Sequence, residues 1–400
     1  MKETATYSDV LFLPHEIIRN ILKRLPVKSL IRFQCVCKDW KNLMQIPSFI
    51  EDHLQQSTHQ NPSLLLECTG TNIPLLRRLI LLDCRLQVRG VQNLPWNASI
   101  VGSCNGLLCL EIRQFKQFPH SLSLWNPATT AVRHIPRTRT DIPYYDKCVT
   151  GFGFSPIVND YKIVRTFTVF YNVTQVEVFS LNRGTWKAID IVNLKGVRLK
   201  KSETVTANGA IFWSGVKLVD EKKEGEDNID LQEDEDYIVE AQDIVDVIVS
   251  FDIAKEVFTV IPRPKIDYHA DVMLTVYENK LALLCHTWKS DDDEIPYVID
   301  LWVLYEGTCA SGQTWSWTKR YTSSPHSCTL DPRTIWRNEI VYKPISELHD
   351  DGGRRSVLYM TNLTTNEVKR SVIPYHEIIR SIYIYVESLV SVGNNYIEES

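Results

Sequence analysis

A hairpin-like pattern recurs five times along the chain and constrains its fold more than any other feature. Each copy has an apolar or aromatic run, a polar turn and a second run that usually ends in proline. The copies are LWNPATTAVRHIP from Leu124, VFSLNRGTWKAID from Val178, SFDIAKEVFTVIP from Ser250, a looser LWVLYEGTCASGQTWSWTKR from Leu301 and YMTNLTTNEVKRSVIP from Tyr359. A short apolar run precedes each copy, in order NGLLCL, GFGFSP, NGAIFWSG, ENKLALLC and RNEIVYK. Runs of this composition between turn residues are typical of β-strands.

The spacing of the copies indicates how the strands are grouped. Consecutive copies begin 54, 72, 51 and 58 residues apart. A period near 50 residues, with about four strands in each unit, is typical of a β-propeller, a ring of small sheets called blades. We therefore predict a mainly β fold, with a propeller-like domain over residues 60–395 and a small α-helical module before it.

The two ends of this domain are expected to share one further blade. SLLLE and RLILLDC, within residues 63–84, would supply outer strands, and SIYIYVESLVSV, residues 381–392, would supply inner ones. Such sharing closes the ring without leaving a free sheet edge at the closure. The prediction is six blades rather than seven.

The longest interval between copies contains a strongly acidic insertion, residues 219–237. Its segment VDEKKEGEDNIDLQEDED holds ten carboxylates and two lysines. A block of like charge with few apolar residues is typical of a solvated, disordered loop. The alternative is a contact surface for a basic partner.

The first fifty residues have a different, helical pattern. Of the 40 residues from 11 to 50, 21 are apolar, and they cover more than the single stripe of an ordinary surface helix. Pro14 stands in a first turn, and Pro26 ends that helix. Helices this short need tertiary partners, and a unit of this size buries little surface.

Two partners could cover the surplus apolar surface of this head. The head could pack on its own C-terminal domain, or part of it could dock onto another protein, which large exposed apolar patches favour. Basic residues around the apolar centre would suit an acidic partner; they are Arg19, Lys23, Arg24, Lys28, Arg32, Lys38 and Lys41.

Residues 9–52, with the run LPHEIIRNILKRLPVKSLIRFQCVCKDWKNLMQIPSFI, resemble an F-box. In that family the motif docks a receptor subunit onto the Skp-type adaptor of a cullin-RING ubiquitin ligase. The resemblance implies an adaptor-facing set of Leu13, Pro14, Ile17, Leu25, Pro26 and Leu30. It also implies a set that holds the module together, namely Ile21, Leu22, Phe33, Val36 and Trp40.

The long remainder resembles the F-box-associated domain of plant F-box proteins. The resembling pieces are GSCNGLLCL, LWNPATT, GFGFSPIVNDYKIVR, NGAIFWSG, VSFDIAKEVF and YVESLVSV. The whole layout is similar to the S-locus F-box branch, which implies a role in pollen–pistil self-incompatibility. The resemblance implies a non-catalytic substrate receptor of an SCF-type (Skp–cullin–F-box) ligase. Its partners would be the adaptor, through it a cullin scaffold, and an unknown target protein held by the propeller.

A catalytic or metal-dependent function finds little support in the sequence. It lacks a G-x-S-x-G elbow, a phosphate loop and an H-E-x-x-H site. Its cysteines form no C-x-x-C pair, and Asp291 to Glu294 lack the spacing of a calcium loop. We expect no cofactor and no metal. The alternative is a propeller enzyme or a lectin-like binder, with a helical appendage and a small-molecule ligand in the central channel.

Charge and hydropathy bound the partners and the compartment. A net charge of −5 gives no electrostatic footprint for nucleic acid. No window approaches the ~18 uninterrupted apolar residues of a membrane span. The first ten residues lack an apolar signal core. We therefore expect no nucleic-acid or membrane partner, and a location in the cytoplasm with the nucleus as a second compartment.

Tryptophans in the strand-like runs allow two interpretations. As interface anchors they would bind strongly, but aromatic side chains dominate β-rich cores. We favour packing between blades for Trp96, Trp125, Trp186, Trp213, Trp288, Trp302, Trp315, Trp317 and Trp336.

Overall fold

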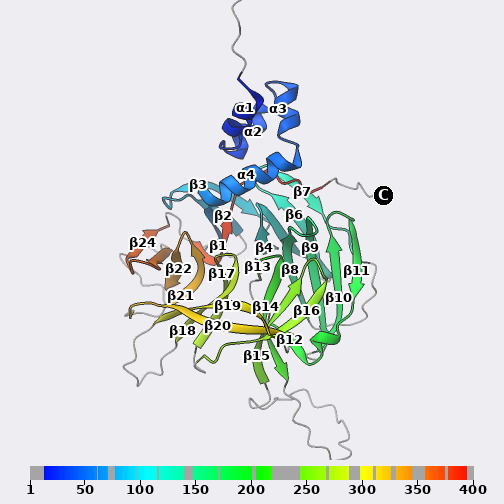
Figure 1. Ribbon diagram of the computed structural model, residues 1–400, viewed down its shortest axis with the longest axis vertical. Helices are drawn as coiled ribbons and strands as arrows, with labels where there is room; N and C mark the ends of the chain where they lie inside the picture. Colours follow the sequence, from blue (N-terminus) through cyan, green and yellow to red (C-terminus); the bar gives the residue numbers. More distant parts are fainter. Residues whose placement is uncertain are drawn as a thin grey trace, which may run out of the picture.

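The protein is a six-bladed β-propeller with a four-helix head, as seen in a computed structural model (Figure 1). The structure describes residues 13–60, 62–70, 77–95, 97–114, 117–138, 147–169, 172–200, 204–218, 244–266, 270–287, 298–309, 312–325, 330–344, 356–373 and 377–393. The helices lie together at the top of Figure 1, and α4 lies between the other three and the sheets.

The helices of the head are α1 (His15–Leu22), α2 (Val27–Phe33), α3 (Lys38–Leu43) and α4 (Pro47–Gln60). Pro14 and Pro26 directly precede α1 and α2. Proline suits the start of a helix because its missing N–H would have no partner there. The predicted helical module is confirmed, although α4 runs past residue 52 to Gln60.

Blade 1 is the sheet that closes the ring, and its strand order is β25-β1-β2-β3. Its strands are β25 (Glu377–Tyr385), β1 (Ser63–Gly70), β2 (Arg77–Leu82) and β3 (Val88–Leu94). β25 and β1 pair antiparallel from Ser63↔Tyr385 to Gly70↔Glu377. The shared blade is confirmed.

The other five blades follow in chain order. Blade 2 has β4 (Ala98–Cys104), β5 (Leu107–Gln114), β6 (Gln117–Asn126) and β7 (Ala131–His134). Blade 3 has β8 (Lys147–Ser155), β9 (Asp160–Val169), β10 (Asn172–Ser180) and β11 (Thr185–Ile189). Blade 4 has β12 (Val197–Leu199), β13 (Val205–Ala207), β14 (Ala210–Leu218), β15 (Ile244–Asp252) and β16 (Val257–Pro262). Blade 5 has β17 (Ala270–Tyr277), β18 (Lys280–Thr287), β19 (Ile299–Cys309) and β20 (Gly312–Thr322). Blade 6 has β21 (Leu330–Trp336), β22 (Glu339–Pro344), β23 (Val357–Asn362) and β24 (Val368–Val372).

The C-terminal segment differs from the expected inner strands. Only β25 is a strand, and residues 386–393 leave the sheet. Asn126 Nδ2 donates to the carbonyl oxygens of Ser388 at 3.0 Å and Val390 at 2.9 Å, and Arg133 Nη1 donates to that of Val392 at 3.3 Å. These side chains of blade 2 hold the segment, so no second strand partner is needed for its backbone.

The recurring hairpins form the two outermost strands of blades 2 to 6. In three of them a side-chain oxygen at the end of the third strand accepts hydrogen bonds from the backbone two and three residues later. These residues are Asn126, Asp252 and Asn362. Such Asx turns reverse the chain locally, which explains why the polar turn recurs with the strands.

The first hairpins of the blades use residues with positive φ. Asn105 and Gly106 have φ of 51° and 80°, and Asn208 and Gly209 have 48° and 75°. Two successive left-handed residues match the turn that joins closely paired strands, and Asn-Gly supplies it at little strain.

Six hydrophobic clusters occupy the spaces between neighbouring blades. Trp213 of β14 is fully buried between blades 3 and 4. A Cβ at Gly151 of β8 would collide with its indole ring. The seven described tryptophans of the predicted set all lie in or against these clusters, whereas Trp96 and Trp288 fall outside the described residues.

The ring has two distinct rims. In an antiparallel blade the first and third turns lie at one rim, and the second turn and the link to the next blade lie at the other. Ala128, in the β6–β7 turn, packs against the core of the head. We therefore name this side the head rim and the opposite side the far rim.

Candidate functional site

The head has a small core of its own. Phe33 and Trp40, both half-buried, pack edge to face with ring centroids 5.6 Å apart. Around them the buried side chains are Leu22, Val27, Leu30, Met44 and Phe49.

Three apolar side chains on one side of the head face solvent. Leu13, Ile17 and Ile21 are 56, 45 and 48% exposed. Ile17 and Ile21 are four apart and lie on the same side of α1, and Leu13 directly precedes the N-cap residue Pro14. We name these three residues the α1 stripe. An exposed apolar row on a folded module is typical of an interaction surface.

Three residues of the head differ in burial from the sides on which they were expected, while their assigned roles stay predictions. Leu30 was expected on the adaptor-facing side, but it is completely buried in the head core. Ile21 and Val36 were expected to hold the module together, but they are 48 and 61% exposed. The helical period explains Ile21, because Leu22 and the half-buried Ile18 turn inward and leave it beside Ile17.

The other predicted residues have the following positions. Leu13, Pro14, Ile17 and Pro26 are exposed, and Leu25 is half-buried. Of the predicted core set, Leu22 is buried, and Phe33 and Trp40 are half-buried. Contact of the predicted adaptor-facing residues with an adaptor stays a prediction.

One residue of the basic rim points into the head. Arg19 Nη2 lies 2.8 Å from Asp52 Oδ2 and donates to Ser48 Oγ at 3.2 Å, so it ties α1 to α4. Its guanidinium also lies 5.7 Å from the Phe49 ring centroid. The basic side chains left at the surface are Lys23, Arg24, Lys28, Arg32, Lys38 and Lys41, with Lys23 half-buried.

The core of the head also contacts the propeller. Leu389, from the C-terminal segment, is buried within the head core, and Ala128 of blade 2 packs against that core. Ser388 Oγ donates to the Asn105 carbonyl at 2.7 Å, which fixes the segment on the ring. One face of the head therefore packs on the propeller, whereas the α1 stripe is exposed, and docking of that stripe onto another protein stays a prediction.

A buried histidine stands at this joint. His53 is 1% exposed, and its Nε2 lies 3.0 Å from the Leu25 carbonyl oxygen. The carbonyl can only accept, so Nε2 carries the proton. Burial lowers the pKa of His53 below its ordinary value of 6.5, while the hydrogen bond to Leu25 and the charge of Glu387 oppose the shift.

The central channel contains a cavity of about 310 Å³ near the head rim. Its walls come from the innermost strands, and Thr58 of α4 reaches it. The polar lining includes Thr206, Thr275 and Arg333. Among the residues that the structure describes, no three His, Cys, Asp or Glu side chains are grouped to hold a metal ion.

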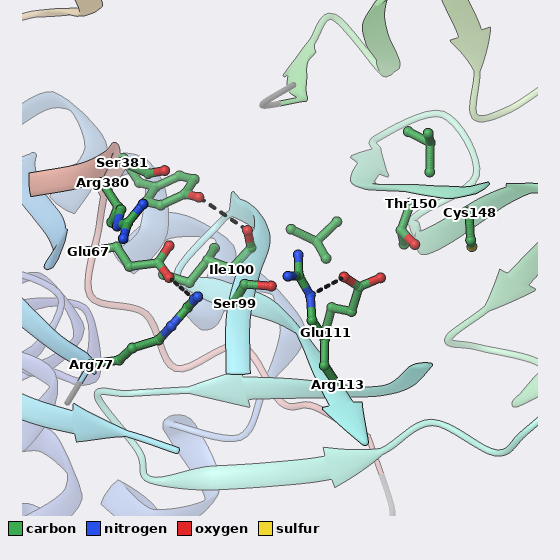
Figure 2. Close-up of a pocket in the computed structure, with 13 residues that line it drawn as sticks. Glu67, Arg77, Ser99, Ile100, Glu111, Arg113, Cys148, Thr150, Arg380 and Ser381 are labelled. Atoms are coloured by element: carbon green, nitrogen blue, oxygen red, sulfur yellow. Dashed lines mark hydrogen bonds and ion pairs between the residues drawn. The ribbon is translucent and has the colours of Figure 1, made fainter. Parts of the chain in front are cut away.

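A second cavity, of about 260 Å³, opens at the far rim between blades 1, 2 and 3 (Figure 2). Arg77, Arg113 and Arg380 line it together with Glu67 and Glu111. No sequence pattern indicated this group, because Arg380 is distant from the other members along the chain and joins them only through the pairing of β25 with β1.

The acidic insertion, residues 219–237, and the Asp291–Glu294 run lie outside the described residues. The strands on either side of the insertion pair at Leu218↔Ile244, at the far rim. In the described part of the chain, no helix is both long and apolar enough to cross a membrane.

Curated relatives of the chain come from Arabidopsis thaliana. At3g16210, an F-box protein by name, is 32% identical over 44% of this chain and 46% of its own length. The F-box protein CPR1 is 25% identical over 78 and 72%. The F-box/kelch-repeat protein At3g23880 is 24% identical over 77 and 78%. The chain thus spans less than half of the first of these relatives.

Solved structures resemble the chain only distantly. The GH93 alpha-L-arabinofuranosidase of Fusarium graminearum is 9% identical over 70% of this chain and 81% of that chain, with a TM-score of 0.38. A likeness this weak carries no argument about activity.

Two family models match the chain directly. The F-box domain matches residues 10–52, which include α1, α2 and α3. The F-box associated beta propeller domain matches residues 75–392, which is most of the chain. The chain therefore belongs to the family of F-box proteins that carry an F-box associated beta propeller domain.

Proposed function

We propose that this protein is a non-catalytic substrate receptor of an SCF-type ubiquitin ligase. The observation that carries the proposal is the α1 stripe, Leu13, Ile17 and Ile21, exposed on a head that matches the F-box domain. The stripe would dock onto a Skp-type adaptor, which in turn would contact a cullin scaffold. The basic residues around it would favour an acidic adaptor surface.

The propeller would hold the target protein. Its strands are committed to packing between blades, so recognition falls on loops and cavities at the rims. The head contacts the head rim at blade 2, so we place the target at the far rim. Holding a target near the transfer machinery raises its effective concentration, and this chain then needs no catalytic residue of its own.

A substitution in the stripe tests the proposal. Ile17→Asp places a charge where an apolar contact is proposed, and loss of an interface anchor costs about 2 kcal/mol or more. We expect loss of adaptor co-purification with an unchanged melting temperature. Val368→Asp is the matched control, since Val368 is 50% exposed on β24 of the propeller. Equal adaptor capture by both variants would contradict the proposal.

The alternative is a propeller enzyme or lectin-like binder with a ligand in the central channel. The 310 Å³ cavity lined by Thr206, Thr275 and Arg333 is the observation that favours it. A small molecule that binds there and is lost in Arg333→Ala would support it.

The location follows from the proposed function, whereas the biological role has a separate basis. A ligase receptor of this kind would work in the cytoplasm and also in the nucleus. A role in pollen–pistil self-incompatibility rests only on the likeness to the S-locus branch. Expression confined to pollen, and altered compatibility after deletion, would support that role.

A further inference from the structure

The far-rim cavity brings together charged side chains from two neighbouring blades. Arg77 begins β2, Arg113 is near the end of β5, and Arg380 is in β25. Glu67 of β1 and Glu111 of β5 lie beside them, and Thr150 of β8 forms part of the wall toward blade 3 (Figure 2). We name this cavity the arginine pocket.

The guanidinium groups of the arginine pocket are more accessible than its carboxylates. The side chains of Arg77 and Arg113 are 23 and 48% exposed, whereas those of Glu67 and Glu111 are 5 and 7% exposed. Arg380 is also exposed. A ligand that enters from solvent therefore meets positive charge first, although the pocket contains both signs.

Arg77 is fixed in place and serves as a positioning residue. Its Nη1 donates to Glu67 Oε1 at 2.9 Å and to the Ala98 carbonyl oxygen at 2.7 Å. Arg77 thus neutralises the buried carboxylate of Glu67 and joins blade 1 to blade 2. Arg113 and Arg380 are more exposed than Arg77 and are the arginines that a ligand can reach.

Arg113 and Arg380 retain unused donors. Arg113 Nε lies 3.7 Å from Glu111 Oε2, beyond hydrogen-bond distance. Arg380 Nε donates to Thr69 Oγ1 at 3.3 Å, and Arg380 forms no ion pair within the described residues. A guanidinium carries five N–H donors, so each side chain can still offer a two-pronged contact.

A buried hydroxyl gives an independent sign of a missing partner. Thr150 is 8% exposed, and its Oγ1 has no hydrogen-bond partner among the described residues. A buried hydroxyl without a partner is costly, and Thr150 is therefore an unsatisfied donor in the wall of the cavity.

We propose that the arginine pocket binds a single anionic group, a carboxylate or a phosphate, carried by the target protein. One of Arg113 and Arg380 would grip its oxygens through the guanidinium fork, and the other would add positive charge from across the pocket (Figure 2). Planar oxyanions match the guanidinium fork, and partial burial strengthens the attraction. The proposal rests on the proposed function, since it names the chemistry by which the far rim would recognise a target.

Anion titrations of the full-length protein test the proposal before any target is known. Inorganic phosphate and acetate are added separately at constant ionic strength, and the melting temperature is followed. We expect at least one anion to raise it for the wild-type protein. An Arg113→Gln/Arg380→Gln double variant should bind that anion about tenfold more weakly, because each lost contact is a charge-assisted hydrogen bond.

Two further variants keep the test decisive. Arg183→Gln changes one charge in the β10–β11 turn at the head rim and should bind like the wild type. If the double variant does not fold, Arg113→Lys/Arg380→Lys keeps the charge, loses the fork and should also bind more weakly. A stronger effect of phosphate indicates a phosphorylated side chain on the target, and a stronger effect of acetate an Asp, Glu or terminal carboxylate.

The outcomes separate this inference from the ligase proposal. If neither anion stabilises the wild type, or if the arginine variants respond like it, the arginine pocket is not an anion site. Adaptor co-purification is measured on the same variants and should be unchanged. If only Ile17→Asp loses adaptor co-purification, that result concerns the head and does not affect the conclusion about the arginine pocket.

Discussion

The head and the propeller bury their apolar side chains in different ways. The propeller has six clusters, each shared by two neighbouring blades. The head has a single small core, and that core includes Leu389 from the propeller's C-terminal segment. A repeated architecture can stabilise itself through neighbour contacts, whereas a unit of about forty residues depends on outside surface. The fold of the head therefore depends partly on contacts with the propeller.

The largest expected effect comes from the core between blades 3 and 4. Trp213→Ala removes a fully buried indole and should destabilise the propeller by about 3–5 kcal/mol. Chemical denaturation followed by fluorescence measures it. The control is Val257→Ala, an exposed residue of β16 for which a change within about 0.5 kcal/mol is expected. Equal losses in both would contradict a propeller held by interblade clusters.

Phe49→Ala should separate the two regions. Phe49 is fully buried in the head core, and its removal should cost about 3 kcal/mol. Because the interblade clusters do not contain Phe49, hydrogen exchange should rise in α1 to α4 while the blade strands keep their protection. A propeller that loosens together with the head would show one cooperative unit instead of two.

The joint at His53 predicts a pH dependence. The unfolded chain protonates this imidazole near pH 6.5, but the folded protein resists protonation because burial lowers the pKa. As the pH falls below 6.5, the unfolded state binds the proton first, so the stability of the head decreases until the lowered pKa is reached. Hydrogen exchange of α4 from pH 7.5 to 5 measures the effect, and His53→Gln should flatten it. An α4 protection that is independent of pH would contradict this assignment.

The smallest effect is expected for the acidic insertion. Replacing residues 219–236 with a short Gly-Ser linker should leave the melting temperature nearly unchanged, since loop length costs only about 0.6 kcal/mol per doubling. A fall of many degrees would indicate that the segment packs on the ring.

The propeller could be predicted from the sequence because the residues that define each hairpin lie close together along the chain. Each hairpin carries its own turn chemistry, such as the Asn126 side chain at the β6–β7 turn, and the period follows from repetition. The shared blade was also accessible, because strand-like runs stood at both ends of the repeat. Local patterns, however, could not show that Asn126 and Arg133 hold residues 388–392 outside the sheet.

The candidate sites were less predictable, for two physical reasons. In the head, the family resemblance located the module, but the helical period decides burial residue by residue. Leu30, which was expected at the adaptor-facing surface, is therefore buried, and Ile21, which was expected in the core of the head, is exposed. In the arginine pocket, Arg77 and Arg380 meet only because β25 joins the N-terminal strands, and no sequence window contains both.

The closure through β25 has a consequence for how the protein is made. A ribosome produces a chain from its N-terminus towards its C-terminus, so the head emerges before β25 and Leu389. Until then the first blade lacks its inner strand, and the head lacks part of its core. A prematurely terminated product would carry the F-box without a complete core for it. The head therefore completes its core only after β25 and Leu389 have been synthesised.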